Sequence, residues 1–122
     1  MKKSIFIIIT ILSIGGLAES CSKSKDNNPA GGGRTFSCTG ISPKFAADVL
    51  PIFNTVCSIN STCHATGTTN SGGPFTNYTQ IAAKTSDIRA AILSGVMPQT
   101  GSITQAQTNN LICWIDSGAP NN

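Results

Sequence analysis

The sequence predicts an all-α fold for the C-terminal part of this 122-residue chain. Apolar side chains recur at helical spacing in residues 42–56, 86–94 and 104–117. No segment alternates between apolar and polar residues as a half-exposed strand does. The segments between the periodic stretches are rich in Gly, Pro, Thr, Ser and Asn, a composition that favours loops.

The first expected helix spans residues 42–56. Its apolar face is formed by Phe45, Val49, Ile52, Phe53 and Val56. Pro43 suits the first turn of this helix, whereas Pro51 should kink it or split it. Residues 65–73 are almost entirely Thr, Asn, Ser and Gly, so we expect a loop without a role in the core.

Three further helices are expected after this loop. A short one covers residues 77–83, and a longer one begins at an N-cap, Ser86, and stops at Gly95. Residues 96–102 must form a loop. The last helix covers residues 104–117, buries Leu111, Trp114 and Ile115, and ends at Gly118.

The N-terminus is typical of an export signal. Lys2 and Lys3 precede an apolar run, residues 5–17, that is too short to span about 30 Å of hydrocarbon as a helix. Residues 17–21 are similar to a bacterial lipobox, in which the signal is cut before a cysteine that becomes diacylated. We therefore expect a lipoprotein-type signal peptide over residues 1–20, a lipid anchor at Cys21 and attachment to a membrane of the bacterial cell envelope. Glu19 stands where a small residue is usual, so a cut elsewhere that leaves Cys21 free stays open.

Residues 21–37 are polar and Gly-rich and predict a flexible tether, followed by one domain over residues 38–122. The basic and acidic residues of this domain balance, so it carries no basic patch and we expect no nucleic-acid partner. A domain of this size has a thin core and often needs a disulfide, a metal or a cofactor to be stable. Export permits disulfides.

The residues that carry chemistry are Cys57, Cys63, His64 and Met97. His64 is the only histidine, and a histidine directly after a cysteine, with a second cysteine upstream, is typical of a c-type haem site. Such sites usually have two residues between the cysteines, whereas five separate Cys57 from Cys63. A plain disulfide between Cys57 and Cys63 is therefore an alternative, and a structural zinc site is a weaker one. Met97 lies before Pro98 in a polar loop, which distinguishes it from an ordinary core methionine.

In this order, the elements resemble the class I cytochrome c fold and, more narrowly, the small haem-c lipoproteins of Bacteroidetes-type bacteria. The resemblance rests on five segments: residues 48–53, 63–64, 73–78, 88–98 and 115–120. It implies a helical domain wrapped around one covalent haem c, with thioethers at Cys57 and Cys63. His64 would be the proximal iron ligand and Met97 the distal one.

The resemblance has two further consequences. The two ends of a cytochrome fold pack against each other, which implies a disulfide between Cys38 and Cys113. Trp114 is expected in the core, and it could also pack on the porphyrin.

The leading interpretation is an exported, membrane-anchored monohaem c-type cytochrome that carries single electrons between redox partner proteins. It would be an electron carrier and not an enzyme: with His64 on the iron, no general base remains for a hydrolase. The first alternative is a disulfide-stapled structural or binding lipoprotein with the same fold and no haem. The second is a haem-dependent catalyst such as a peroxidase, which needs an open sixth position and is disfavoured by Met97.

Overall fold

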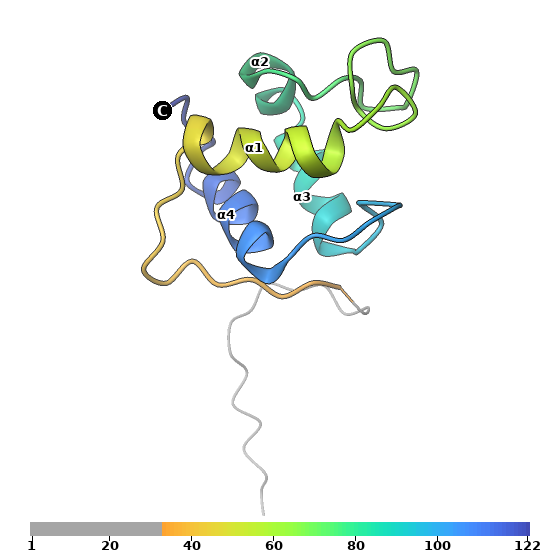
Figure 1. The fold of residues 1–122 in the computed structure, drawn as a ribbon. Helices are drawn as coiled ribbons and strands as arrows, with labels where there is room; N and C mark the ends of the chain where they lie inside the picture. Colours follow the sequence, from red (N-terminus) through yellow and green to blue (C-terminus); the bar gives the residue numbers. More distant parts are fainter. Residues whose placement is uncertain (1–32) are drawn as a thin grey trace, which may run out of the picture.

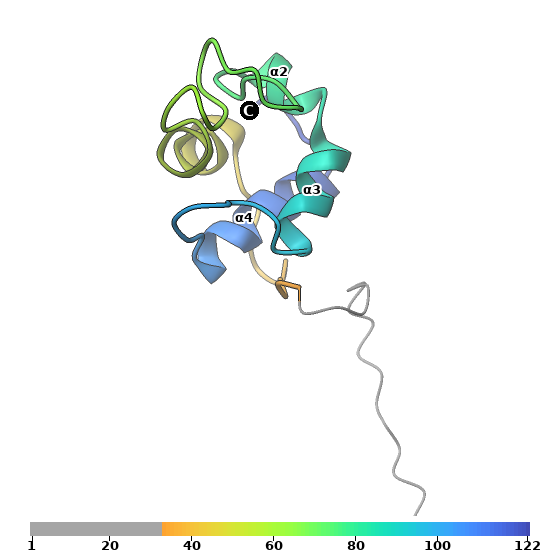
Figure 2. The same cartoon turned by 90° about the vertical axis from the view of Figure 1, so that its right-hand side faces the viewer.

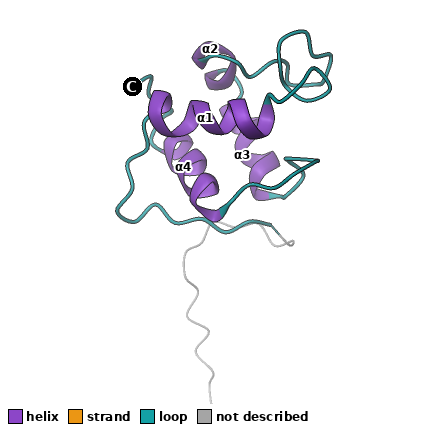
Figure 3. Cartoon of the chain, in the orientation of Figure 1, coloured by secondary structure: helices purple, strands orange, loops and turns teal. Residues whose placement is uncertain are grey.

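The computed structural model describes residues 33–122, and within this part the chain forms helices and loops without any strand (Figures 1 and 3). The all-α prediction is confirmed for these residues. The expected signal peptide, the anchor Cys21 and the first part of the tether lie outside the described residues.

The first helix is one continuous coil from Phe45 to Cys57, made of η1 (Phe45–Val49), α1 (Leu50–Ile52) and η2 (Phe53–Cys57) (Figure 1). In η1 and η2 the turns are wider than in an α-helix: the N–H of Leu50 donates to the carbonyl of Phe45, five residues back. Pro51 has no N–H, and its ring would crowd the carbonyl four residues before it in a regular α-helix. The wider turns accommodate Pro51, so of the expected kink or split, the split does not occur.

The start of this helix differs from the prediction. Pro43 precedes the helix, because the N-cap is Lys44, whose side chain makes no capping bond. The first N–H groups are instead bound by the C-terminal residue: the N–H of Phe45 donates to Oδ1 of Asn122 at 2.8 Å, and the N–H of Ala46 donates to the Asn122 carbonyl at 3.0 Å. The C-terminus of the chain therefore caps the first helix.

The other helices are α2 (Tyr78–Ala82), α3 (Thr85–Leu93) and α4 (Gln105–Asp116), each within two residues of its predicted range. A capping box begins α4, in which Thr104 and Gln107 each accept a backbone N–H of the other. The expected N-cap at Ser86 is wrong, because α3 begins earlier and its N-cap is Lys84.

The centre of the core is Trp114 on α4, which is fully buried. Its ring lies 5.4 Å from that of Phe45 and 6.5 Å from that of Tyr78, measured between centroids. Its indole N–H donates to the carbonyl of Pro120 at 2.8 Å, and the Tyr78 hydroxyl donates to the carbonyl of Ala119 at 3.0 Å. These two bonds fold the C-terminal residues over the core.

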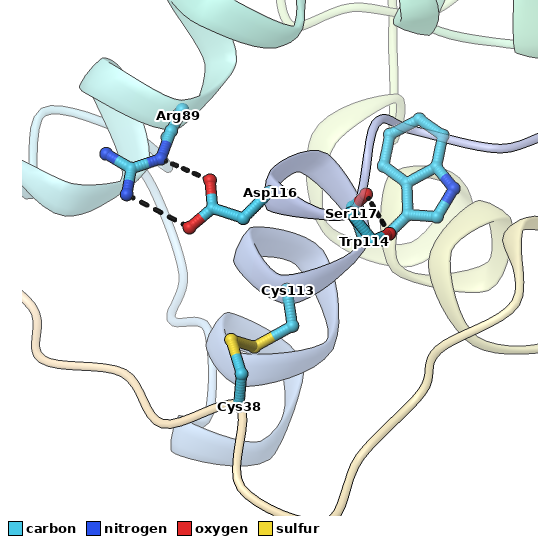
Figure 4. Close-up of polar contacts among 6 residues, drawn as sticks. All are labelled: Cys38, Arg89, Cys113, Trp114, Asp116 and Ser117. Carbon is cyan, nitrogen blue, oxygen red and sulfur yellow. Dashed lines mark hydrogen bonds and ion pairs between the residues drawn. A yellow bond between two sulfur atoms is a disulfide. The ribbon is translucent and has the colours of Figure 1, made fainter.

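Cys38 and Cys113 form a disulfide, with their Cα atoms 5.5 Å apart (Figure 4). The predicted pairing is confirmed. The bond fixes the segment before the first helix to the last turn of α4.

Residues 34–37, which the sequence places in the tether, lie against the domain. The carbonyl of Thr35 accepts a bond from Gln105 at 2.8 Å, and the N–H of Ser37 donates to Asn109 at 3.0 Å. Phe36 packs on the core and lies beneath the guanidinium of Arg89, 5.5 Å from its ring centroid. We call residues 34–38 the N-terminal strap, which runs along α4 and belongs to the fold.

Candidate functional site

A cavity of about 460 Å³ lies among the first helix, α3 and the loops that follow each of them. Figure 2 shows the first helix and α3 on opposite sides of the domain, with the loop of residues 94–104 running from the end of α3 to the start of α4. The volume of the cavity is in the range of sites that hold a small molecule or a cofactor. The cavity is lined by all four predicted site residues, Cys57, Cys63, His64 and Met97.

Apolar side chains from three elements form much of the remaining wall. They are Phe53, Val56, Phe75, Ile88, Ala91 and Ile92. Polar residues from the loops, among them Asn60, Asn70 and Gln99, complete it. Trp114 does not line the cavity, so of its two expected roles the structure supports only the one in the core.

The imidazole of His64 is buried and held in one orientation. Its Nδ1 lies 2.9 Å from the carbonyl oxygen of Gly73, which can only accept, so the proton belongs on Nδ1. The ring of Phe75 stacks on it with centroids 4.4 Å apart. No hydrogen bond among the described residues uses Nε2, so this nitrogen keeps its lone pair for a ligand or a metal ion.

Hydrogen bonds also fix the backbone of His64. Its N–H donates to the carbonyl of Cys57 at 3.0 Å, and its carbonyl accepts the N–H of Phe75 at 2.8 Å. The hydroxyl of Ser58 lies 3.0 Å from the carbonyl oxygens of both His64 and Phe75. These contacts join the end of the first helix, His64 and the segment that enters α2.

The five residues between the cysteines fold into a closed turn around Asn60. The Asn60 Oδ1 accepts the N–H groups of Thr62 and Cys63, each at 3.0 Å, and the Thr62 hydroxyl at 2.6 Å. The turn brings the chain back so that the N–H of His64 meets the carbonyl of Cys57. The unusual spacing is therefore taken up by a compact turn, and both cysteines still line one cavity.

Cys57 and Cys63 are both free thiols in the structure, so the alternative disulfide between them is not formed. Burial and, to a smaller extent, the neighbouring Cys63 raise the pKa of Cys57 to about 11. Cys57 is therefore protonated at neutral pH.

The loop of residues 65–73 has no buried residue, as expected of a loop without a role in the core, but it supports the site. Its Gly73 carbonyl orients His64, and the Thr68 hydroxyl and the Asn70 amide donate to the carbonyl of Cys63 at 2.6 and 2.9 Å. Gly72 and Gly73 have φ angles of 108° and 82°, which favour glycine. This glycine pair was the signal in the sequence that could have identified the loop as a structured turn.

Met97 is half-buried at the cavity wall, on the loop that leaves α3. Its N–H donates to the carbonyl of Ala91 at 3.1 Å, and its carbonyl accepts a bond from Arg34 at 2.6 Å. The sequence indicated Met97 but gave no sign of the contact from Arg34.

The described residues 33–122 also lack two further features. No group of three or more His, Cys, Asp and Glu side chains is placed to hold a metal ion, which leaves a structural zinc site without a ligand set in this range. No helix in the same range is long and apolar enough to cross a membrane.

Comparison of the chain with protein-family models, with curated proteins and with solved structures finds no match. The function of the chain must therefore be inferred from the residues of the site itself.

Proposed function

We propose that this protein is a monohaem c-type cytochrome that carries single electrons between redox partner proteins. The observation that carries the proposal is the convergence of Cys57, Cys63, His64 and Met97 on one cavity, although Met97 is far from the other three in the sequence. Such a convergence is what one covalently bound haem with two axial ligands requires.

The donor atoms fit haem iron in chemical type. His64 offers a neutral imidazole whose Nδ1 proton is bound by a backbone carbonyl, as metal-binding histidines usually have it. Met97 offers an uncharged thioether, a ligand that raises the reduction potential of haem iron. When bound, the haem would supply the reversible one-electron couple that an electron carrier needs.

The protein's own contribution is attachment, orientation and exclusion of water. Cys57 and Cys63 would hold the porphyrin by thioether bonds, for which both must be reduced, as they are in the structure. Phe75 and the Gly73 carbonyl keep the imidazole in place. Phe53, Ile88 and Ile92 give the cavity an apolar wall that would limit the access of water to the bound iron.

The envelope location and the membrane anchor belong to the same proposal and depend on the sequence. The segment before Cys21 is similar to a lipoprotein signal. A tether of polar and glycine residues between Cys21 and the strap would let the domain reach its partners.

The visible spectrum of the chain produced with the c-type maturation machinery tests this function. We expect a Soret band and the low-spin spectrum of a histidine–methionine site, with haem still attached after denaturation. The double variant Cys57→Ala/Cys63→Ala should abolish covalent attachment, and His64→Ala should abolish the low-spin spectrum. Ser61→Ala, at an exposed residue between the two cysteines, is the matched control and should keep the haem. A wild-type chain without a Soret band would refute the proposal and favour the haem-free structural or binding lipoprotein.

A further inference from the structure

Arg34 joins the N-terminal strap to the loop that carries Met97. Its guanidinium Nη1 donates to the carbonyl of Ile92 at 2.7 Å and to the carbonyl of Met97 at 2.6 Å. Its backbone N–H donates to the carbonyl of Leu93 at 2.7 Å. One residue thus binds two carbonyls at the end of α3 and the carbonyl of the proposed iron ligand itself.

The hydrogen bonds of Arg34 can hold the loop that carries Met97 in one position. The last carbonyls of a helix lack partners within the helix, and a positive charge there is favoured by the helix dipole. Hydrogen bonds from a charged donor are about twice as strong as those between neutral groups. The Arg34 side chain is half-buried, which protects its bonds from competing water.

Arg34 can hold a fixed position because the strap is itself fastened. Thr35 and Ser37 bind side chains of α4, and Cys38 is bonded to Cys113 on the same helix. On the other side, the N–H of Met97 donates to the carbonyl of Ala91 in α3. The Met97 backbone is therefore held from both sides, by α3 through its N–H and by the strap through its carbonyl.

We propose that Arg34 is a positioning residue that holds Met97 in place as the sixth ligand of the iron. The inference rests on the proposed cytochrome function. It assigns a role in the site to a residue that lies outside the cavity and comes from the segment next to the tether.

The test uses the full chain as purified and two variants, Arg34→Gln and Arg34→Lys. The first readout is hydrogen exchange at the Met97 N–H, which needs no haem. Arg34→Gln should raise its exchange rate about tenfold, equivalent to about 1.4 kcal/mol, and Arg34→Lys should restore part of the protection. Lys44→Gln removes one charge from an exposed side chain and is the control, with no expected change.

The second readout is carbon monoxide binding by the reduced haem protein, which requires Met97 to leave the iron. The Arg34→Gln variant should bind carbon monoxide about tenfold faster than the wild type. The Met97→Ala variant, which lacks the sixth ligand, gives the upper limit of the binding rate. Unchanged exchange and unchanged binding in Arg34→Gln would overturn the inference while a normal wild-type spectrum keeps the cytochrome proposal. An equal effect in Lys44→Gln would also overturn it. A wild-type chain without haem would instead be the failure of the proposed function.

Discussion

Removal of the disulfide between Cys38 and Cys113 should cost the domain a large part of its stability. The bond closes a loop with a sequence separation of 75 residues. In the chain-entropy account of cross-linking, a loop of this length corresponds to about 4.5 kcal/mol at 25 °C. Structure that persists in the unfolded chain reduces this figure, so we expect a loss of about 3 to 4.5 kcal/mol in Cys38→Ala. For comparison, the whole free energy of unfolding of a small domain is about 5 to 15 kcal/mol.

Urea unfolding of the full chain, followed by circular dichroism, measures this loss. Adding a reductant to the wild type should lower the transition midpoint by the same amount as the substitution. The Cys38→Ala variant should show no further change with reductant, since Cys57 and Cys63 are not paired. A loss below about 1 kcal/mol would refute the reasoning. It would mean that the strap and α4 are held together by their other contacts, without help from the bond.

Four further outcomes are expected. When the chain is produced without haem, Cys57 should react slowly with iodoacetamide at pH 8 and faster as the pH approaches 11, because its raised pKa keeps the thiol protonated. A fast reaction of Cys57 at pH 8 would contradict this prediction. Asn60→Ala should lower the free energy of unfolding by about 1 kcal/mol and increase the fraction of single-thioether haem by mass, whereas Asn54→Ala, on an exposed part of η2, should do neither. Met97→Ala should keep the haem but lower its reduction potential in voltammetry, and an unchanged potential would exclude Met97 as a ligand. Cys21→Ser should move the protein out of the membrane fraction, and equal partition of both forms would disprove the anchor.

Much of the fold could be predicted because its signals are local. The apolar spacing located the first helix, α3 and α4, and Gly95 and Gly118, both with positive φ, ended the last two. The start of the first helix could not be found this way. Its cap is Asn122, at the other end of the chain, and no local pattern contains that contact.

The same difference between local signals and long-range contacts decides which residues of the candidate site could be predicted. Cys57, Cys63, His64 and Met97 could be selected from their residue types and order, and the structure places all of them around one cavity. The residues that support them could not be selected. Gly73 acts through its backbone carbonyl, and Arg34 through contacts across the fold, so neither residue type indicates its role.

The most direct test of the central claim is the mass of the tryptic peptide of residues 45–84, which contains both Cys57 and Cys63. The protein should be produced with the c-type maturation machinery and digested after denaturation. The proposal predicts that the peptide carries the mass of one haem and has no thiol left to alkylate. A peptide without the mass of haem, which carries either two alkylated thiols or a disulfide between them, would contradict it.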